Sequence, residues 1–505
     1  MPPKKKASPR DVHPDTVAGV DLGSNSFHMI VARIENGQPQ VIDRIKEMVQ
    51  LGAGLDDKKR LEDDARARAL DCLGRFGQRL RALPRSAVRA VGTNTLRQLR
   101  DGDDFLRAAE SALGHPVEVI SGHEEARLIY LGVAHGLAGQ ETRLVVDIGG
   151  GSTELIIGEG FEPHRMESLH MGCVSMSQRF FPKGRITERA MKDAVIGGRL
   201  EVRPVQAHFN QDQWQTAIGS SGTIKAIRDI VHAAGWCDDG ISRGSLKKLR
   251  RMIVDAGHTE KLEAEGLAAE RRAVLPGGVA VLSAVFKALD IDGMRVSDEA
   301  LREGLLYELL GYIRHEDVRD RTVDSLSKRY GIDERQAKRV EISAAALLGQ
   351  VARSWDLTAP EHAELLSWAA RLHEIGLTVS HSSFHKHGAY LVANSDLSGF
   401  SRQQQSVLAA LIRGHRRRFP REVFDALPER LRQCGERLCV LLRLAALMHR
   451  ERSAIGKPML YLEAKQDVLR ARFPEDWLVK HPLTREELEQ EARYLKAAGY
   501  KMKFS

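Results

Sequence analysis

Val17-Ala-Gly-Val-Asp-Leu-Gly-Ser-Asn-Ser26 and Leu144-Val-Val-Asp-Ile-Gly-Gly-Gly-Ser-Thr-Glu154 share one pattern: an apolar run ends in an aspartate and continues into a turn of glycines and serines. A buried strand that ends in such a turn exposes backbone N–H groups, which form a concave binding site for anions. Asp21 and Asp147 would place carboxylates beside these turns, and carboxylates alone repel phosphate. The repeated pattern therefore predicts two facing lobes that hold a phosphate chain together with a divalent cation.

The composition is that of an ordinary soluble protein with several domains, because the 505 residues are 42% hydrophobic and 29% charged. No apolar run approaches the roughly 20 residues that cross a bilayer, and the basic N-terminus lacks the apolar core of a secretory signal, so we expect a cytoplasmic protein. The five cysteines form no C-x-x-C pair, which predicts reduced thiols. The net charge of +8 would attract polyanions, whether nucleic acid, polyphosphate or, peripherally, an acidic membrane surface.

The texture of the sequence divides the chain into five segments. Residues 1–14 are basic and predict a disordered tail. Residues 15–128 alternate short apolar runs with a long helical stretch, and residues 129–314 repeat this theme, which is typical of two α/β lobes. Residues 315–475 are rich in Ala, Leu and Arg with helical periodicity and predict an all-helical domain, while residues 476–505 predict a small separate unit.

A candidate catalytic glutamate lies where a predicted strand meets a helix, in Ser121-Gly-His-Glu-Glu125. Ser121 and Glu124 have the spacing of a capping box, in which each side chain bonds the backbone N–H of the other residue. Glu125 is then free to act as a general base for water at the positive end of the helix. The alternative interpretation is a pair of solvated glutamates at a helix start.

The segment Ile218-Gly-Ser-Ser-Gly-Thr-Ile-Lys225 resembles a phosphate loop, although it does not match the Walker A pattern. Backbone N–H groups of residues 219–223 would hold phosphate at a helix N-terminus, and Lys225 would add a positive charge. A tight strand-to-helix turn with a surface lysine is the alternative.

Arg97 ends the segment Gly92-Thr-Asn-Thr-Leu-Arg97 after another predicted strand. It would form a bidentate pair with phosphate, or an ordinary surface salt bridge. Both interpretations stay open at this point.

Histidines gather in the predicted helical domain, at His373, His381, His385, His387 and His415. His373-Glu374 resembles the His-Asp pair of the HD metal-dependent phosphohydrolases, with glutamate in the place of aspartate. This departure favours a structural HD-like fold whose histidines pack or bind anions. Arginines at 413 and 416–418 form a solvated face or part of a polyanion track.

Taken together, these motifs resemble the exopolyphosphatase and guanosine pentaphosphate phosphohydrolase family, within the actin, hexokinase and Hsp70-like ATPase superfamily. Beside the motifs above, the resemblance rests on Met171-Gly-Cys-Val174 and Leu301-Arg-Glu-Gly304. It implies an α/β fold of two ribonuclease-H-like lobes, an all-helical HD-like domain and a small C-terminal α+β domain, assembled as a homodimer.

The resemblance also implies a set of site residues. Glu125 matches the catalytic glutamate, and Asp147 and Glu154 match acidic positions for Mg²⁺, which a monovalent cation such as K⁺ would accompany. The phosphate-binding positions are Asp21, Gly23, Ser24, Asn25, Arg97, Gly149, Gly150, Gly151, Ser152, Ser221, Gly222, Thr223 and Lys225.

The predicted function is that of an exopolyphosphatase, which removes terminal phosphates processively from inorganic polyphosphate. The sequence around Met171 is closer to this branch of the family. The alternatives are hydrolysis of guanosine pentaphosphate, both activities together, or an actin-like ATP-dependent kinase. The basic charge alone favours a nucleic-acid-binding regulator, but no motif indicates a specific nucleic acid.

Overall fold

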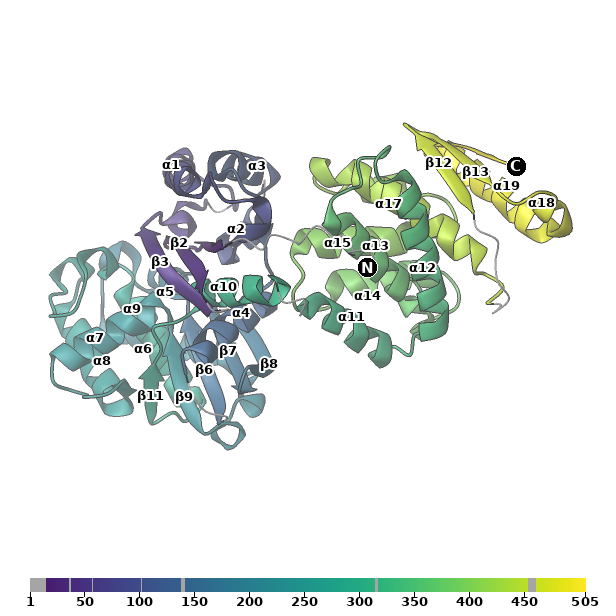
Figure 1. Cartoon of the computed structure of the whole chain (residues 1–505). Coiled ribbons are helices and arrows are strands. Elements are labelled where there is room, and N and C mark those ends of the chain that lie inside the picture. Colours follow the sequence, from purple (N-terminus) through teal and green to yellow (C-terminus); the bar gives the residue numbers. More distant parts are fainter. Residues whose placement is uncertain are drawn as a thin grey trace, which may run out of the picture. The chain divides into compact units, whose positions relative to one another are not determined.

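The computed structural model describes residues 15–35, 38–56, 58–100, 102–137, 141–313, 317–452 and 460–505 (Figure 1). The chain forms two compact units, Met1–Glu316 and Asp317–Ser505. The tail predicted over residues 1–14 lies outside the described residues. No helix in the described ranges is both long and apolar enough to cross a membrane.

The first lobe of the first unit contains a five-stranded sheet in the order β3-β2-β1-β4-β5. The sheet pairs β1 antiparallel to β2 and parallel to β4. Helix α1 buries an apolar face that includes Leu73, Phe76 and Leu80, because these residues recur at helical spacing. The elements of this lobe are β1 (Thr16–Leu22), β2 (Phe27–Glu35), β3 (Gln38–Glu47), α1 (Asp63–Leu80), β4 (Val88–Gly92), α2 (Asn94–Gln98), α3 (Gly102–Leu113) and β5 (Val117–Val119).

The second lobe repeats this topology in a six-stranded sheet of order β10-β11-β9-β6-β7-β8. Here β6 pairs antiparallel to β7 and parallel to β9, as β1 pairs with β2 and β4. The two ribonuclease-H-like lobes predicted from the sequence are thereby confirmed. The elements of this lobe are β6 (Thr142–Ile148), β7 (Thr153–Glu159), β8 (Glu162–Leu169), α5 (Cys173–Phe180), α6 (Glu188–Val202), β9 (Thr216–Ser220), α7 (Ser221–Ala233), β10 (Ile241–Ser242), α8 (Arg243–Ala256), α9 (Leu275–Ala288) and β11 (Gly293–Val296).

Two helices cross between the lobes, α4 (Gly122–His135) and α10 (Leu301–Ile313). Helix α4 follows the first sheet along the chain and packs on the second, whereas α10 follows the second sheet and packs on the first. Apolar residues of α4 pack with Val145, Ile156 and Ile218 of the second sheet. Apolar residues of α10 pack with Val17 and Ile30 of the first sheet. The boundary placed between residues 128 and 129 therefore falls inside α4, which belongs by its packing to both lobes.

The second unit is mainly helical. A single core joins apolar residues of its helices, and Trp355 and Trp368 are among its largest fully buried side chains. The helices are α11 (Val318–Arg329), α12 (Glu334–Val351), α13 (Pro360–Leu372), α14 (Phe384–Asn394), α15 (Arg402–Gly414), α16 (Arg421–Asp425) and α17 (Glu429–Met448), followed by α18 (Trp477–Lys480) and α19 (Pro482–Ala497).

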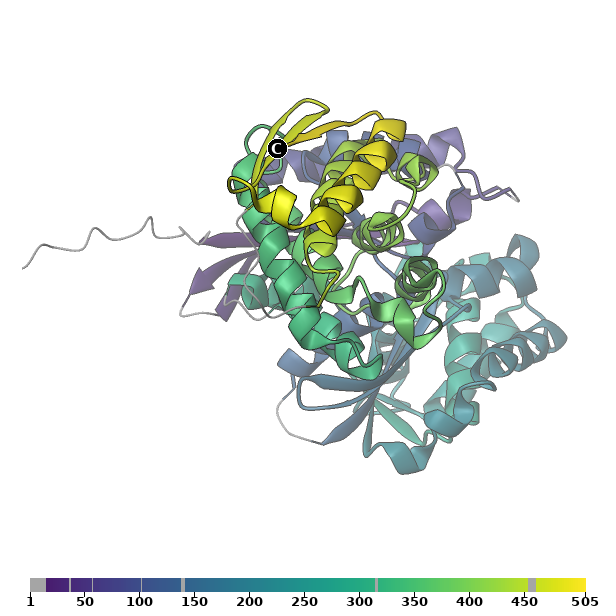
Figure 2. The ribbon, with the colours of Figure 1, turned by 90° about the vertical axis from the view of Figure 1, so that its right-hand side faces the viewer.

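A three-stranded sheet ends the chain, with β12 (Tyr461–Lys465) antiparallel to β13 (Val468–Arg472), and β13 parallel to β14 (Lys501–Phe504). Leu462, Leu469 and Met502 belong to the same buried core as the helices of this unit. The strands lie next to α19, and both are drawn in yellow (Figure 2). The small sheet thus begins within the segment assigned to the helical domain, before residue 476. It shares a core with the helices, and the two do not form separate units.

Candidate active site

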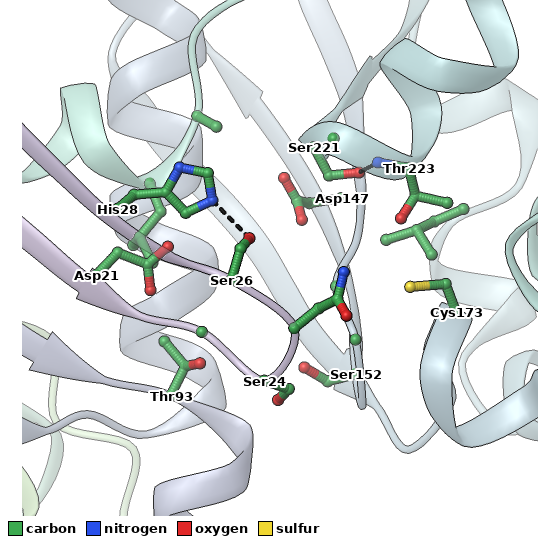
Figure 3. Close-up of a pocket in the computed structure, with 18 of the residues that line it drawn as sticks. Asp21, Ser24, Ser26, His28, Thr93, Asp147, Ser152, Cys173, Ser221 and Thr223 are labelled. Carbon is green, nitrogen blue, oxygen red and sulfur yellow. Dashed lines mark hydrogen bonds between the residues drawn. The ribbon is translucent and has the colours of Figure 1, made fainter. Parts of the chain in front are cut away.

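A cavity of about 270 Å³ lies between the two lobes of the first unit. The turn after β1 and the turn after β6 form facing walls, and the start of α7 adds a third side. In Figure 3, Asp21 and Ser24 of the first lobe lie on one side and Asp147, Ser221 and Thr223 of the second lobe on the other.

The two glycine turns approach each other closely. A Cβ atom added at Gly150 would lie 2.8 Å from the Ser24 Cβ, so a larger residue there would force the turns apart. Within the second turn the Gly149 N–H donates to the Ser152 carbonyl at 2.9 Å. The two similar sequence segments, 17–26 and 144–154, therefore contribute facing turns to one site.

Helix α7 begins at the cavity, and Ser221, Gly222 and Thr223 line it. The free backbone N–H groups of a helix N-terminus favour an anion at this position. The Ser221 hydroxyl accepts from the Thr223 N–H at 3.2 Å, and Ser221 itself has a left-handed φ of 87°. Lys225 also lines the cavity while its Nζ donates to the Asp298 carbonyl at 2.5 Å.

Buried carboxylates crowd one part of the site. Burial, and next the charge of Glu125, raise the pKa of Asp21 to about 8. Burial raises the pKa of Asp147 to about 6 against a hydrogen bond of 2.6 Å from the Ser220 hydroxyl. Burial, followed by the charges of Glu125 and Asp147, holds the pKa of Glu154 well above its usual range. These acidic groups destabilise one another's charge, which is typical of a site that receives a cation.

Glu125 lies in the first turn of α4 and lines the cavity. Ser121 caps this helix, since its hydroxyl accepts from the Glu124 N–H at 3.1 Å. The Glu124 carboxylate binds the Arg127 guanidinium through two contacts of 2.8 Å. The Ser121 half of the predicted capping box is thereby confirmed, while the Glu124 carboxylate contacts Arg127 and Glu125 lines the cavity. The Glu125 carboxylate also has a partner there, because Arg97 Nη1 lies 2.7 Å from its Oε2.

Most of the predicted site residues come together around this cavity. Those that line it are Asp21, Gly23, Ser24, Asn25, Glu125, Asp147, Gly149, Gly150, Ser152, Ser221, Gly222, Thr223 and Lys225. Arg97, Gly151 and Glu154 are not among the lining residues. Arg97 contacts Glu125. Glu154 is fully buried, with the Ser168 hydroxyl donating to its Oε1 at 2.8 Å.

Several cavity residues were missed from the sequence, above all the cations Lys46, Arg271 and Arg302 and the neighbouring His28. Burial, then the charge of Arg271, lowers the pKa of Lys46. Burial, then the charge of Arg302, holds the pKa of His28 well below its usual range, and Arg302 Nη1 lies 3.1 Å from His28 Nδ1. The cavity thus combines carboxylates with a group of cations.

The available signal for these residues differed. Arg302 lies inside the quoted segment Leu301–Gly304, and His28 follows the first glycine turn by two residues, so both positions carried a local signal. Lys46 on β3 and Arg271 before α9 carry no local motif, because only the folded topology brings them to the cavity.

The donor set fits Mg²⁺ when a phosphate chain is also present. Asp21 Oδ1 is buried without a hydrogen-bond partner among the described residues. Hard oxygen ligands of this kind suit Mg²⁺, which commonly takes one or two carboxylates and completes its shell with phosphate and water. No group of three or more His, Cys, Asp or Glu side chains in the described ranges could hold a metal ion by itself.

The histidine cluster lies in the second unit. The rings of His373 and His415 are 5.3 Å apart, and each Nδ1 lies 2.7 Å from a backbone carbonyl of its own helix. Glu374 Oε1 accepts from Arg452 at 2.6 Å. Burial lowers the pKa of both histidines, so they are neutral packing groups near neutral pH.

Comparison with known proteins identifies the family of this chain. Residues 30–313 match the family described as Ppx/GppA phosphatase, and residues 318–492 match domain III of Ppx/GppA phosphatase. A guanosine-5'-triphosphate,3'-diphosphate pyrophosphatase of Vibrio cholerae is 42% identical over 478 residues, which are 94% of this chain and 95% of that protein. The protein of the same name from Aliivibrio fischeri is 41% identical over 482 residues, 95% of this chain and 96% of that one.

One similar solved structure is named for a different activity. The crystal structure of an exopolyphosphatase from Cytophaga hutchinsonii is similar with a TM-score of 0.54 and 26% identity, over 59% of this chain and 98% of that chain. The placement nearer the exopolyphosphatase branch is not confirmed, since the relatives above at 41–42% identity carry the other name. By its sequence, its two-lobed fold and its cavity, the chain belongs to the Ppx/GppA phosphatase family and is a hydrolase of phosphoanhydride bonds.

Proposed function

We propose that this chain hydrolyses the terminal 5′ phosphoanhydride of guanosine pentaphosphate, releasing orthophosphate and the tetraphosphate. The observation that carries the proposal is that several carboxylates and several cationic side chains line one small cavity. The chain is also 42% identical to a protein named for this substrate. A cavity of about 270 Å³ is below the usual size of a drug-sized ligand pocket, so it would receive the phosphate end of the nucleotide.

The terminal phosphate would lie between the two glycine turns and the start of α7, where backbone N–H groups bind its oxygens. Lys46, Arg271 and Arg302 would balance the charge of the phosphates that follow. Asp21 and Asp147 would hold Mg²⁺ from opposite lobes. When bound, Mg²⁺ neutralises phosphate charge and orients the chain.

Glu125 would orient the attacking water and accept its proton. The water oxygen bonds the terminal phosphorus as the bond from that phosphorus to the bridging oxygen breaks. Positioning and charge neutralisation supply most of the acceleration in such a reaction. E125Q keeps the shape of the side chain but removes the base, so we expect turnover to fall by roughly 10²-fold or more. Full activity in this variant would contradict the role of Glu125.

The direct test offers the purified protein guanosine pentaphosphate and long-chain polyphosphate side by side with Mg²⁺, and measures orthophosphate from each. We expect kcat/KM for the nucleotide to exceed that for polyphosphate by about tenfold, a difference of ~1.4 kcal/mol in transition-state binding. Transfer of a phosphoryl group from ATP to a sugar, without release of orthophosphate, would instead support a kinase.

Hydrolysis of inorganic polyphosphate is the second candidate. It is favoured by the similarity to the Cytophaga structure named as an exopolyphosphatase. A polyphosphate rate equal to or above the nucleotide rate in the same assay would make it the main activity.

A further inference from the structure

Arg97 contacts the candidate base and is not among the residues that line the cavity. Its Nη1 donates to Glu125 Oε2 at 2.7 Å and to the Ile120 carbonyl at 3.1 Å. The side chains of Arg97 and Glu125 are each 10% exposed. Glu125 lines the cavity and Arg97 does not. The guanidinium therefore meets the site through the carboxylate that it holds.

We propose that Arg97 is a positioning residue that fixes the Glu125 carboxylate at the cavity wall, in place of the phosphate ligand that the family resemblance implies. The inference rests on the proposed function, because it concerns the carboxylate that would orient water. Among the described residues, Glu125 is the one acidic group of the site that forms an ion pair with a cation at contact distance.

The other carboxylates explain why such a partner is needed. Asp147 and Glu154 receive hydrogen bonds from the Ser220 and Ser168 hydroxyls, which are neutral. Both carboxylates, together with Asp21, lie near enough to Glu125 for their charges to interact. Repulsion from these groups would turn a flexible glutamate away from the cavity. Since a misplacement of about 1 Å can cost ~10²-fold in rate, a partner that holds Glu125 in place would raise the rate through that carboxylate.

Both hydrogen bonds of Arg97 leave one guanidinium nitrogen, whose plane fixes their directions. Ile120 follows β5, and Glu125 lies in the first turn of α4, so Arg97 joins the end of a strand to the start of the helix. Arginine bridges two acceptors with one planar group, whereas a lysine ammonium is a point charge on a flexible stem. R97K would keep the charge but lose the fixed orientation.

The test is a double-mutant cycle on the full chain, with R97Q, E125Q and R97Q/E125Q assayed for orthophosphate release from guanosine pentaphosphate. We expect R97Q to lower kcat by about 10²-fold and to leave KM within about a factor of three. R97Q/E125Q should be no slower than E125Q, because Arg97 acts on the rate only through the Glu125 carboxylate, which E125Q has already removed. R97K should fall between R97Q and wild type. R100Q is the matched control: Arg100 is exposed on the same lobe, and we expect wild-type kinetics.

The opposite pattern would overturn the inference. A phosphate ligand predicts that R97Q raises KM tenfold or more and that its deficit multiplies with that of E125Q. Circular dichroism checks the fold of each variant, and if R97Q fails to fold, R97K decides: lowered kcat at unchanged KM supports positioning, and full activity refutes it. A wild-type chain that releases no orthophosphate would refute the proposed function itself, before any variant is compared.

Discussion

Asp21 shows how one half-buried side chain of the cavity links the site to stability. Its pKa is about 8 in the folded protein, against an ordinary value of 3.8. The carboxyl group of Asp21 therefore binds its proton more tightly in the folded state than in the unfolded state. The contribution of Asp21 to the free energy of unfolding therefore falls as pH rises from about 4 to about 8. The cavity is least stable where its carboxylate is charged, which is the state that a bound cation would compensate.

D21N removes this titration. We expect the variant to gain stability relative to wild type as pH rises from about 5 to about 8 in the absence of Mg²⁺, while losing activity. Urea denaturation at several pH values measures the difference. D238N, at an exposed aspartate of the second lobe, should run parallel to wild type. Parallel curves for D21N would show that Asp21 is charged throughout this range.

At the scale of elements, the crossing of α4 and α10 depends on glycine. A Cβ atom added at Gly304 would lie 1.9 Å from the Leu128 carbonyl oxygen, which is backbone and cannot move aside. G304A should therefore destabilise the first unit by about 1–3 kcal/mol, as overpacking does elsewhere. Chemical denaturation provides the measurement.

G74A is the control for this substitution. Gly74 lies inside α1 with nothing within 4 Å of an added Cβ. Alanine should therefore stabilise the helix by about 0.5–1 kcal/mol. Equal effects of G304A and G74A would contradict a close crossing.

The sequence predicted single helices and strands better than the contacts between them. The strands around Asp21 and Asp147 were predictable because a buried run, a carboxylate and a glycine turn are all local signals. The packing of α4 on the second sheet and of α10 on the first was not predictable, because it depends on contacts between segments far apart in the chain. The same holds for Lys46 and Arg271, and for Arg97, whose contact with Glu125 forms only when α2 and α4 meet.

At the scale of the molecule, a buried ion pair joins the C-terminal helix to the rest of the second unit. Arg443 on α17 donates to Glu491 on α19 at 2.5 and 2.9 Å, and also to the carbonyls of Gly414 and Arg417. R443M would leave Glu491 buried and unpaired, so we expect a loss of about 3–5 kcal/mol in urea denaturation. R443M/E491L should recover part of this loss. An unchanged stability for R443M would show that the pair is dispensable.

The division into two units yields a final prediction, because every residue of the candidate site lies before Asp317. The Cytophaga exopolyphosphatase is matched over 98% of its chain by 59% of this one, so a related fold exists at little more than half this length. We expect a chain cut after Glu316 to fold and to hydrolyse guanosine pentaphosphate with a kcat within about tenfold of the full chain, or ~1.4 kcal/mol. E125Q in the shortened chain controls for contaminating phosphatases. Loss of turnover in a folded fragment would mean that the second unit supplies something the cavity lacks, and with it a reason for the two units to be joined.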